Sequence, residues 1–503
     1  MTWIVLALGV AAAAPAALRF LRVAQREHYL GGSTIRFALR WWTGSRNVWL
    51  FVAGIVGLAA TPWWWWMALV PIGVAALGPL GLGVRGVSSP LRWTGRLRRL
   101  TAIVSGSAAL LIVASVVLEF VTVVAAILAL GMPLLIDLGL ALAAPLEARL
   151  GRRWIDKARD KLNAVDPRIL AITGSYGKTT TKEYARLLLA AEMQVVASPA
   201  SFNNAMGLAR AINEHLTPGS ELFIAEMGAY GPGEIAALCS WIPPEVAIIT
   251  AIGPVHLERF GSLERTLEAK SEILEGAGVA VLNIDDRRLA GLADRQAGVR
   301  RVIRCSAIDT SADVCVLGHN GVQEVWAGGA LLARLDPPVA FATNVACAIG
   351  AALAFGVDPG SIRSALAGAD RPAHRQTLTQ SDLGFTIIDD TYNSNPAGAS
   401  AGLQLLGEIG SGARRVLVTP GMVELGADQV TENARLAAQA VEVATDILIV
   451  GLTNRRALLK GTEGGRASVM VVDSRPEAVE WVRANLGRGD VVLYENDLPD
   501  HYP

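Results

Sequence analysis

One short run combines glycines, a lysine and hydroxyl side chains in the order that a triphosphate site requires. Residues 171–181 read AITGSYGKTTT. Glycines let backbone N–H groups close around phosphates, Lys178 can reach the β- and γ-phosphates, and the Thr179 hydroxyl can hold Mg²⁺. The apolar run 168–172 predicts a strand before the loop, and residues 182–191 predict a helix after it. This context predicts that the run binds ATP.

The residues of this loop that we assign to ATP are Thr173, Gly174, Ser175, Gly177, Lys178, Thr179 and Thr180. The loop departs from the usual P-loop pattern, which has a glycine five residues before the final glycine–lysine pair. This chain has Ile172 at that position. The assignment therefore depends on the strand and the helix that flank the loop.

Two further polar groups follow predicted strands. Glu226 comes directly after the apolar run 222–225, and His256 follows the run 246–250. Ligands of an open α/β sheet gather at the carboxyl ends of its strands, so we expect both side chains beside the loop. A carboxylate and an imidazole at this edge can complete the coordination of Mg²⁺.

The chain after residue 153 alternates between apolar strand-like runs and helical segments, which predicts an α/β fold with a mostly parallel sheet and helices on both faces. The predicted strands are 168–172, 222–225, 246–250, 279–282, 385–388, 415–418, 447–450, 469–472 and 491–493. A helical stretch breaks at residues 368–372. We therefore expect a central domain over residues 151–370 and a C-terminal domain over residues 371–503.

The first 150 residues are dominated by apolar stretches, and the mean hydropathy of the whole chain is +0.39. Residues 1–18 and 47–84 contain no charge, and residues 100–146 contain only Glu119 and Asp137. A membrane-spanning helix needs about 20 apolar residues. The first stretch predicts one such helix and the other two predict a pair each, so we expect a membrane domain of five transmembrane helices in residues 1–150, with four as the alternative.

The charges between these stretches predict an orientation. Six arginines lie in residues 19–46 and five in residues 85–99, whereas the two predicted hairpin turns contain no lysine or arginine. Positive loops stay in the cytoplasm. We therefore expect a multi-pass protein of the plasma membrane whose ATP-binding part after residue 153 is cytoplasmic, with membrane lipid as a partner.

The net charge of zero is the sum of a basic N-terminal part and an acidic remainder. Residues 1–153 contain 14 arginines, no lysine and four acidic residues, whereas the remainder contains 31 basic and 41 acidic residues. An acidic second part without a basic stripe excludes nucleic acid as a partner. The four cysteines form no C-x-x-C pair, so neither a zinc ribbon nor a disulfide framework is expected.

Six motifs occur in the order in which the Mur ligases have them, and the chain resembles this family over roughly residues 165–460. The motifs are TGSYGKTTTKE (173–183), SFNNAMG (201–207), AEMGAYGPGEIA (225–236), GPVHLERFGSLERTLEAKSEI (253–273), VLNIDD (281–286) and DDTYNSNP (389–396). They are most similar to the branch that adds D-alanyl-D-alanine to UDP-N-acetylmuramoyl-tripeptide. The resemblance implies a P-loop central domain and a Rossmann-like C-terminal domain, with transmembrane helices in place of the UDP-binding domain.

This resemblance implies an ATP- and Mg²⁺-dependent amide ligase of cell-wall peptidoglycan synthesis. In the family, a substrate carboxylate attacks the γ-phosphate to give an acyl phosphate, and an amine then displaces phosphate. The implied partners are a muramyl-peptide or lipid-linked envelope precursor and an amino acid or dipeptide that supplies the amine.

The resemblance also implies roles for individual residues. The catalytic residues would be Lys178, His256, Lys270 and Arg375. The Mg²⁺ ligands would be Thr179, Glu226, His256 and Lys270, the last as a carbamate. Asn344, Arg375 and Asp390 would join the loop in binding ATP. The substrates would meet Asn203, Asn204, Tyr392, Asn393 and Asn395.

Two departures from the family leave the substrate open. The apolar N-terminal part stands where the family has its UDP-binding domain, and the acidic run 494–500 replaces a basic segment after the last strand. A ligase for another envelope polymer, such as a poly-glutamate-type chain, remains an alternative. A non-catalytic ATP-binding membrane scaffold is a second alternative, although it would not need the complete set of catalytic side chains.

Overall fold

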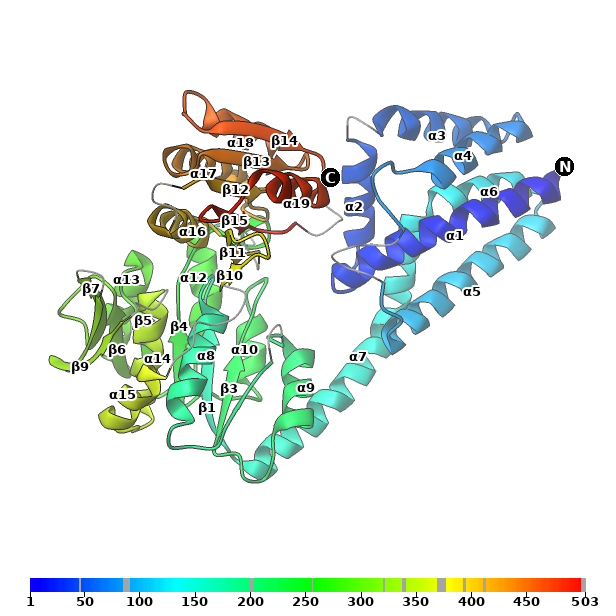
Figure 1. Ribbon diagram of the computed structural model, residues 1–503. Coiled ribbons are helices and arrows are strands. Elements are labelled where there is room, and N and C mark those ends of the chain that lie inside the picture. Colours follow the sequence, from blue (N-terminus) through cyan, green and yellow to red (C-terminus); the bar gives the residue numbers. More distant parts are fainter. Residues whose placement is uncertain are drawn as a thin grey trace. The chain divides into compact units, whose positions relative to one another are not determined.

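The computed structural model of the protein describes residues 1–44, 47–84, 91–199, 202–255, 257–319, 322–336, 341–368, 377–391, 395–409 and 413–498. Two compact units are distinguished, Met1–Gly151 and Arg152–Asp497. The first is helical, and the second contains two β-sheets with helices against them (Figure 1).

The described part of the first unit contains short and long helices. They are α1 (Thr2–Arg26), α2 (Ser33–Trp42), α3 (Val48–Ala60), the 3₁₀ turn η1 (Trp65–Ala68), α4 (Leu69–Leu77), α5 (Gly95–Val117) and α6 (Val121–Leu130). The 34-residue helix α7 (Met132–Val165) begins in this unit and ends in the second.

The helix lengths overturn the predicted membrane topology. The stretch 47–84 forms α3 with 13 residues and α4 with nine, too short for the pair of crossings expected there. Among the described residues, only α1 and α5 are long and apolar enough to cross a membrane, or three segments if α6 and α7, which meet at 81°, count as one. The prediction of five crossings, or four, and of a multi-pass protein in the plasma membrane is therefore wrong.

Polar side chains inside the first unit have structural partners. Asp137 of α7 is buried, and its Oδ2 accepts a hydrogen bond of 2.8 Å from the backbone N–H of Ile35 in the first turn of α2. Gly32 precedes this helix with a φ of 73° and supplies no side-chain cap. Asp137 therefore caps α2 from a distant part of the chain. Arg19 similarly donates to the carbonyl oxygen of Gly78 at 2.7 Å.

The first sheet of the second unit has the strand order β2-β3-β1-β4-β5-β6-β7-β8-β9. Its strands are β1 (Arg168–Thr173), β2 (Val195–Ala197), β3 (Leu222–Glu226), β4 (Val246–Ile249), β5 (Val279–Asn283), β6 (Arg301–Ser306), β7 (Val314–His319), β8 (Val322–Ala327) and β9 (Ala330–Leu335). The strands from β2 to β7 are parallel to their neighbours, and β8 is antiparallel to both β7 and β9.

Helices cover both faces of this sheet, because successive strand residues point to opposite sides. Leu170 and Ile172 pack with α8 and α14 on one face, whereas Ile169 and Ala171 pack with α9, α10 and α13 on the other. The helices are α8 (Lys178–Leu189), α9 (Ala205–His215), α10 (Glu234–Cys239), α11 (Leu257–Phe260), α12 (Leu263–Ser271), the 3₁₀ turn η2 (Glu272–Leu274), α13 (Arg287–Gln296), α14 (Ala342–Ala354) and α15 (Pro359–Ala367).

The second sheet has the order β10-β11-β15-β12-β13-β14, and only the β10–β11 pair is antiparallel. Its strands are β10 (Thr377–Gln380), β11 (Thr386–Asp390), β12 (Arg415–Thr419), β13 (Asp446–Val450), β14 (Ser468–Val472) and β15 (Val491–Glu495). The helices are α16 (Pro396–Ile409), the 3₁₀ turn η3 (Gly426–Asp428), α17 (Gln429–Val443), α18 (Arg455–Thr462) and α19 (Arg475–Asn485). Cores form on both faces, one with α16, α17 and α18 and one with α19.

All nine predicted strands occur within two residues of their predicted ends, which confirms the α/β class. The strands β2, β6, β7, β8, β9 and β10 were not predicted from the sequence pattern. In β8 and β9, polar and apolar residues mix because only part of each strand is buried. The turn between these two strands uses Gly328 and Gly329, which both have positive φ, as tight hairpins require.

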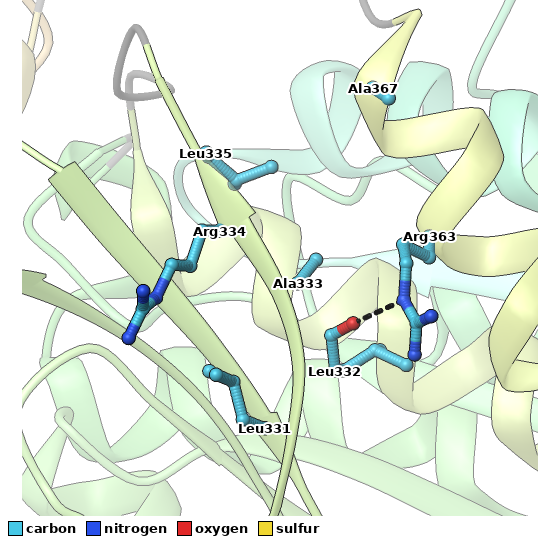
Figure 2. Close-up of a pocket in the computed structure, with 7 residues that line it drawn as sticks. All are labelled: Leu331, Leu332, Ala333, Arg334, Leu335, Arg363 and Ala367. Carbon is cyan, nitrogen blue, oxygen red and sulfur yellow. Dashed lines mark hydrogen bonds between the residues drawn. The ribbon is translucent and has the colours of Figure 1, made fainter.

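A cavity of about 350 Å³ lies between the edge strand β9 and helix α15 (Figure 2). Arg363 Nε donates a hydrogen bond of 2.8 Å to the Leu332 carbonyl oxygen there, so a side chain satisfies one backbone group of the open edge. None of the predicted site residues that the structure describes lines this cavity. We therefore describe this cavity as a feature of the fold and do not count it as part of the predicted nucleotide site.

The buried carboxyl group of Glu495 at the end of β15 predicts a pH dependence of stability. Burial raises its pKa from 4.5 to about 8, an effect that the hydrogen bond with Thr419 opposes and the charge of Asp390 increases. Between these pH values the folded state binds the extra proton, so the free energy of unfolding falls as pH rises, by at most about 1.4 kcal/mol per pH unit.

Glu495→Gln removes this titration and keeps the shape of the side chain. Denaturant unfolding of both proteins from pH 4.5 to 8.5 should therefore show the stability of the wild type falling relative to that of the variant, with no further relative change above pH 8. Parallel curves over this range would contradict the assignment.

Candidate nucleotide and ligase site

The predicted phosphate loop joins β1 to α8, and two of its glycines are required by their surroundings. Gly174 has a φ of 147°, and a Cβ atom there would lie 2.0 Å from Thr250 Oγ1. Gly177 has a φ of 79°, and its Cβ atom would lie 2.4 Å from Asn344 Oδ1. Both positions therefore exclude a side chain, and Asn344 of α14 lies against the loop.

Hydrogen bonds fasten the loop to the chain after β4. The Ser175 hydroxyl donates to the Gly253 carbonyl oxygen at 3.1 Å and accepts from the Gly253 N–H at 3.0 Å. The Ser175 N–H donates to the Ala251 carbonyl oxygen at 2.8 Å. The Thr250 hydroxyl donates to the carbonyl oxygen of Tyr176. The loop therefore has a defined shape before any ligand binds.

The first turn of α8 presents positive groups to this loop. Lys178 Nζ donates hydrogen bonds to the carbonyl oxygens of Gly174 at 2.6 Å and of Ser175 at 3.4 Å. No side chain caps the helix, whose N-cap position is Gly177. The exposed N–H groups of a helix start carry a partial positive charge, so this geometry fits a phosphate group.

The carboxylate of Glu226 lies at the carboxyl end of β3, where Glu226 pairs in register with Ile172 of β1. Its side chain is buried. The Thr179 hydroxyl is within hydrogen-bond distance of both carboxylate oxygens, 3.2 Å from Oε1 and 3.1 Å from Oε2. The predicted pair of Mg²⁺ ligands Thr179 and Glu226 is thus in direct contact.

Glu226 also contacts a lysine to which the sequence analysis gave no role. Lys182 Nζ donates to Glu226 Oε2 at 3.0 Å, and the Lys182 side chain is 0% exposed. Burial would raise the pKa of Glu226, but the charges of Lys182 and Lys178 and the hydrogen bonds from Lys182 and Thr179 lower it overall. A sequence signal existed, because Lys182 lies one helical turn after Lys178 on the same face of α8.

Lys270 lies near the end of α12 and is buried, with its Nζ 5.9 Å from the centre of the Phe260 ring. Desolvation lowers the pKa of Lys270 well below its usual range, and the charge of Lys178 lowers it further. The same environment favours the neutral, nucleophilic form of this amine over the ammonium form.

The other loop residues and two predicted substrate residues make contacts inside the fold. The Thr173 hydroxyl donates to the Met227 carbonyl oxygen at 2.8 Å. The buried Thr180 hydroxyl has no hydrogen-bond partner among the described residues. The Asn203 carbonyl oxygen accepts from the Gly228 N–H at 2.7 Å. Asn204 caps α9 by accepting from the Gly207 N–H at 2.9 Å.

The remaining predicted residues belong to the second sheet or cannot be described. Asp390 ends β11 beside Glu495 of β15. Asn395 accepts from the Gly398 N–H at 2.9 Å in the first turn of α16. The predicted residues His256, Arg375, Tyr392 and Asn393 lie outside the described residues. The described part thus brings together the loop, Thr179, Glu226 and Asn344.

Two family models match the chain. The Mur ligase middle domain matches residues 172–327, and the Mur ligase, glutamate ligase domain, matches residues 374–494. Together they cover most of both sheets, whereas β9 and Asn344 lie between the two matches.

Named relatives agree with these matches. A UDP-N-acetylmuramoyl-tripeptide--D-alanyl-D-alanine ligase of Mycobacterium leprae (strain TN) is 35% identical over 370 residues, which cover 65% of this chain and 70% of the relative. A relative of the same name from Bacillus subtilis (strain 168) is 26% identical over 366 residues, 67% of this chain and 75% of the relative.

Solved structures give the same result. MurF from Acinetobacter baumannii and the MurF ligase from Thermotoga maritima in complex with ADP each have a TM-score of 0.59 and 26% identity to this chain. Each similarity covers 69% of this chain, with 77% of the first structure and 80% of the second. The ordered motifs, the loop geometry and these matches lead to one conclusion: the chain belongs to the Mur ligase family.

Proposed function

We propose that the protein is an ATP-dependent ligase of peptidoglycan synthesis that joins a carboxylate of a muramyl-peptide precursor to the amine of D-alanyl-D-alanine. The observation that carries this proposal is a preformed phosphate loop beside the charged, buried carboxylate of Glu226. The names of the relatives supply the substrate pair.

The loop residues would bind the phosphates of ATP. The N–H groups at the start of α8 face the loop, and the ammonium of Lys178 already lies inside it, where phosphate oxygens would replace carbonyl oxygens as its acceptors. The Thr180 hydroxyl, which lacks a partner among the described residues, would gain one. Asn344 touches Gly177 and would lie near the bound nucleotide.

The donor set also fits Mg²⁺, which prefers oxygen ligands and combines one or two carboxylates with substrate phosphates. Glu226 offers a carboxylate and Thr179 a hydroxyl, and these two groups are already in contact. We propose His256 and the carbamate of Lys270 as further ligands. When bound, the ion would neutralise negative charge on the phosphates.

The reaction needs two displacements. An oxygen of the substrate carboxylate attacks the γ-phosphorus of ATP, the bond to the bridging oxygen breaks, and acyl phosphate and ADP result. The amine then attacks the acyl carbon, loses a proton, and the tetrahedral adduct expels inorganic phosphate to leave an amide. Lys178 and the N–H groups of α8 would stabilise the charge on the transferring phosphoryl group.

Other residues would complete the site when the domains close over the nucleotide. We propose Arg375 and Asp390 as contacts of ATP, and Asn203, Asn204, Tyr392, Asn393 and Asn395 as contacts of the substrates. Closure would exclude water from the acyl phosphate. We propose that the chain divides into an N-terminal domain at residues 1–150, a central domain at 151–370 and a C-terminal domain at 371–503.

A second candidate is a ligase of the same chemistry with another envelope substrate, including a lipid-linked precursor. Residues 1–150 lie outside both family matches, and we propose that they stand in place of the UDP-binding domain. The strand β15 ends in Tyr494-Glu495, and these positions offer no positive charge to the terminal carboxylate of a dipeptide. Both observations favour testing several precursors and amines.

The main test measures phosphate release and product mass with the full chain and ATP. The precursor is UDP-N-acetylmuramoyl-tripeptide or its lipid-linked equivalent, each offered with D-alanyl-D-alanine or single amino acids. One pair should give phosphate and an amide product, and Lys178→Ala should reduce the rate about 100-fold or more. The matched control Lys460→Ala changes an exposed lysine of α18 and should leave the rate unchanged. ATP binding without release for any pair would contradict the ligase assignment.

Glycine substitutions separate backbone strain from damage to the loop. Gly177→Ala and Gly276→Ala both place a side chain at positive φ, 79° and 82°, which costs roughly 1–2 kcal/mol each. Only at Gly177 would the new Cβ atom collide with Asn344; the space around Gly276 is open. Calorimetric titration with ADP should show lost binding for Gly177→Ala alone. Equal binding by the two variants would contradict the role of the loop.

Carbamylation of Lys270 predicts a spectroscopic signal. After incubation with ¹³C-bicarbonate at neutral pH, the wild type should show a carbamate carbon resonance by NMR that Lys270→Met lacks. The variant should remain folded, because methionine suits the apolar site beside Phe260, but should lose ligase activity. Identical spectra for the two proteins would exclude the carbamate.

A further inference from the structure

The buried ion pair between Lys182 and Glu226 costs desolvation free energy, so its presence at this position needs an explanation. Lys182 is completely buried and Glu226 is 3% exposed. Removing two charges from water costs several kcal/mol per ion, and a buried pair recovers this only with good geometry. Apolar side chains of similar volume would fill the same space at lower cost. The pair therefore calls for an explanation beyond packing.

The hydrogen bonds divide the two oxygens of Glu226 unequally. Oε2 accepts from Lys182 at 3.0 Å, and the single O–H of Thr179 is shared between Oε2 at 3.1 Å and Oε1 at 3.2 Å, so Oε1 has no other donor among the described residues. Each carboxylate oxygen has about two acceptor sites. Lys182 thus occupies one oxygen and fixes the rotation of the carboxylate, and Oε1 keeps capacity for another partner.

The charges near Glu226 are positive overall. The side chains that shift its pKa by charge are Lys182 and Lys178, two cations around one anion. A divalent cation that enters alone therefore meets the repulsion of two ammonium groups beside one carboxylate. A bound polyphosphate supplies both oxygen ligands and negative charge.

We propose that Lys182 is a positioning residue that holds and neutralises Glu226, so that a divalent cation enters the site only together with nucleotide phosphates. This inference rests on the proposed nucleotide site and adds an order of binding to it. Lys182 keeps Glu226 in place when the cation is absent and prevents the cation from occupying the site alone.

The test measures Mn²⁺ binding by the full-length protein, with the free ion followed by electron paramagnetic resonance, without nucleotide and with saturating ADP. In the wild type, ADP should tighten Mn²⁺ binding by about 100-fold or more, a coupling of about 2.7 kcal/mol. In Lys182→Met, Mn²⁺ binding without nucleotide should become at least about tenfold tighter, so the ratio should fall. Lys182→Arg keeps the charge and should restore the wild-type ratio.

The outcomes separate this inference from the proposed function. If ADP binds but Mn²⁺ binds equally well without it, or if Lys182→Met leaves the ratio unchanged, the role of Lys182 is wrong and the nucleotide site stands. If ADP does not bind, both are wrong. Lys182→Met leaves Glu226 buried without its partner, so its thermal unfolding is recorded first; if it fails to fold, the ratio in the wild type and in Lys182→Arg decides the question.

Discussion

A negative charge in the interior is the constraint around which the central site is organised. Glu226 ends a strand inside the sheet, where an unpaired carboxylate would be strongly unfavourable. Helix α8 satisfies it from two positions one turn apart, with the Thr179 hydroxyl and the Lys182 ammonium. Four residues separate the end of β1 from the start of α8, and the glycine loop that they form lies beside Glu226.

The neighbouring strand completes this arrangement. The end of β4 runs so close to the loop that Gly174 cannot carry a side chain, and Ser175 and Gly253 exchange two hydrogen bonds. Three parallel strands thus contribute to one rigid site: β1 leads into the loop, β3 supplies the carboxylate and β4 holds the loop in shape. The site is therefore preorganised, and the loop loses little conformational entropy when phosphates bind.

Much of this could be predicted from the sequence, because strand alternation and glycine-loop chemistry are local patterns. The strands β1, β3 and β4 and the position of Glu226 followed from them. The partnership of Lys182 with Glu226 did not, since the two residues are 44 positions apart and meet only after the sheet forms. The strands β8 and β9 were also missed, because their mixed polar and apolar residues give no clear period.

The N-terminal unit shows where composition misleads. Apolar content indicates which residues avoid water, but not where a helix stops, and the stretch 47–84 breaks into α3, η1 and α4. Polar groups in this unit also form hydrogen bonds within it that composition does not reveal. Asp137 caps α2, and Arg19 donates to a backbone carbonyl oxygen. The predicted number of membrane crossings was wrong because apolar composition does not show where a helix ends.

The most direct test of the account is a crystal structure of the protein with ADP and Mn²⁺, with the ion located by its anomalous signal. We expect phosphates within the loop between Gly174 and Thr179, and a strong Mn²⁺ peak in contact with both a phosphate oxygen and Glu226 Oε1, while Lys182 remains bonded to Oε2. A nucleotide bound elsewhere, or Mn²⁺ bound without contact to Glu226, would contradict it.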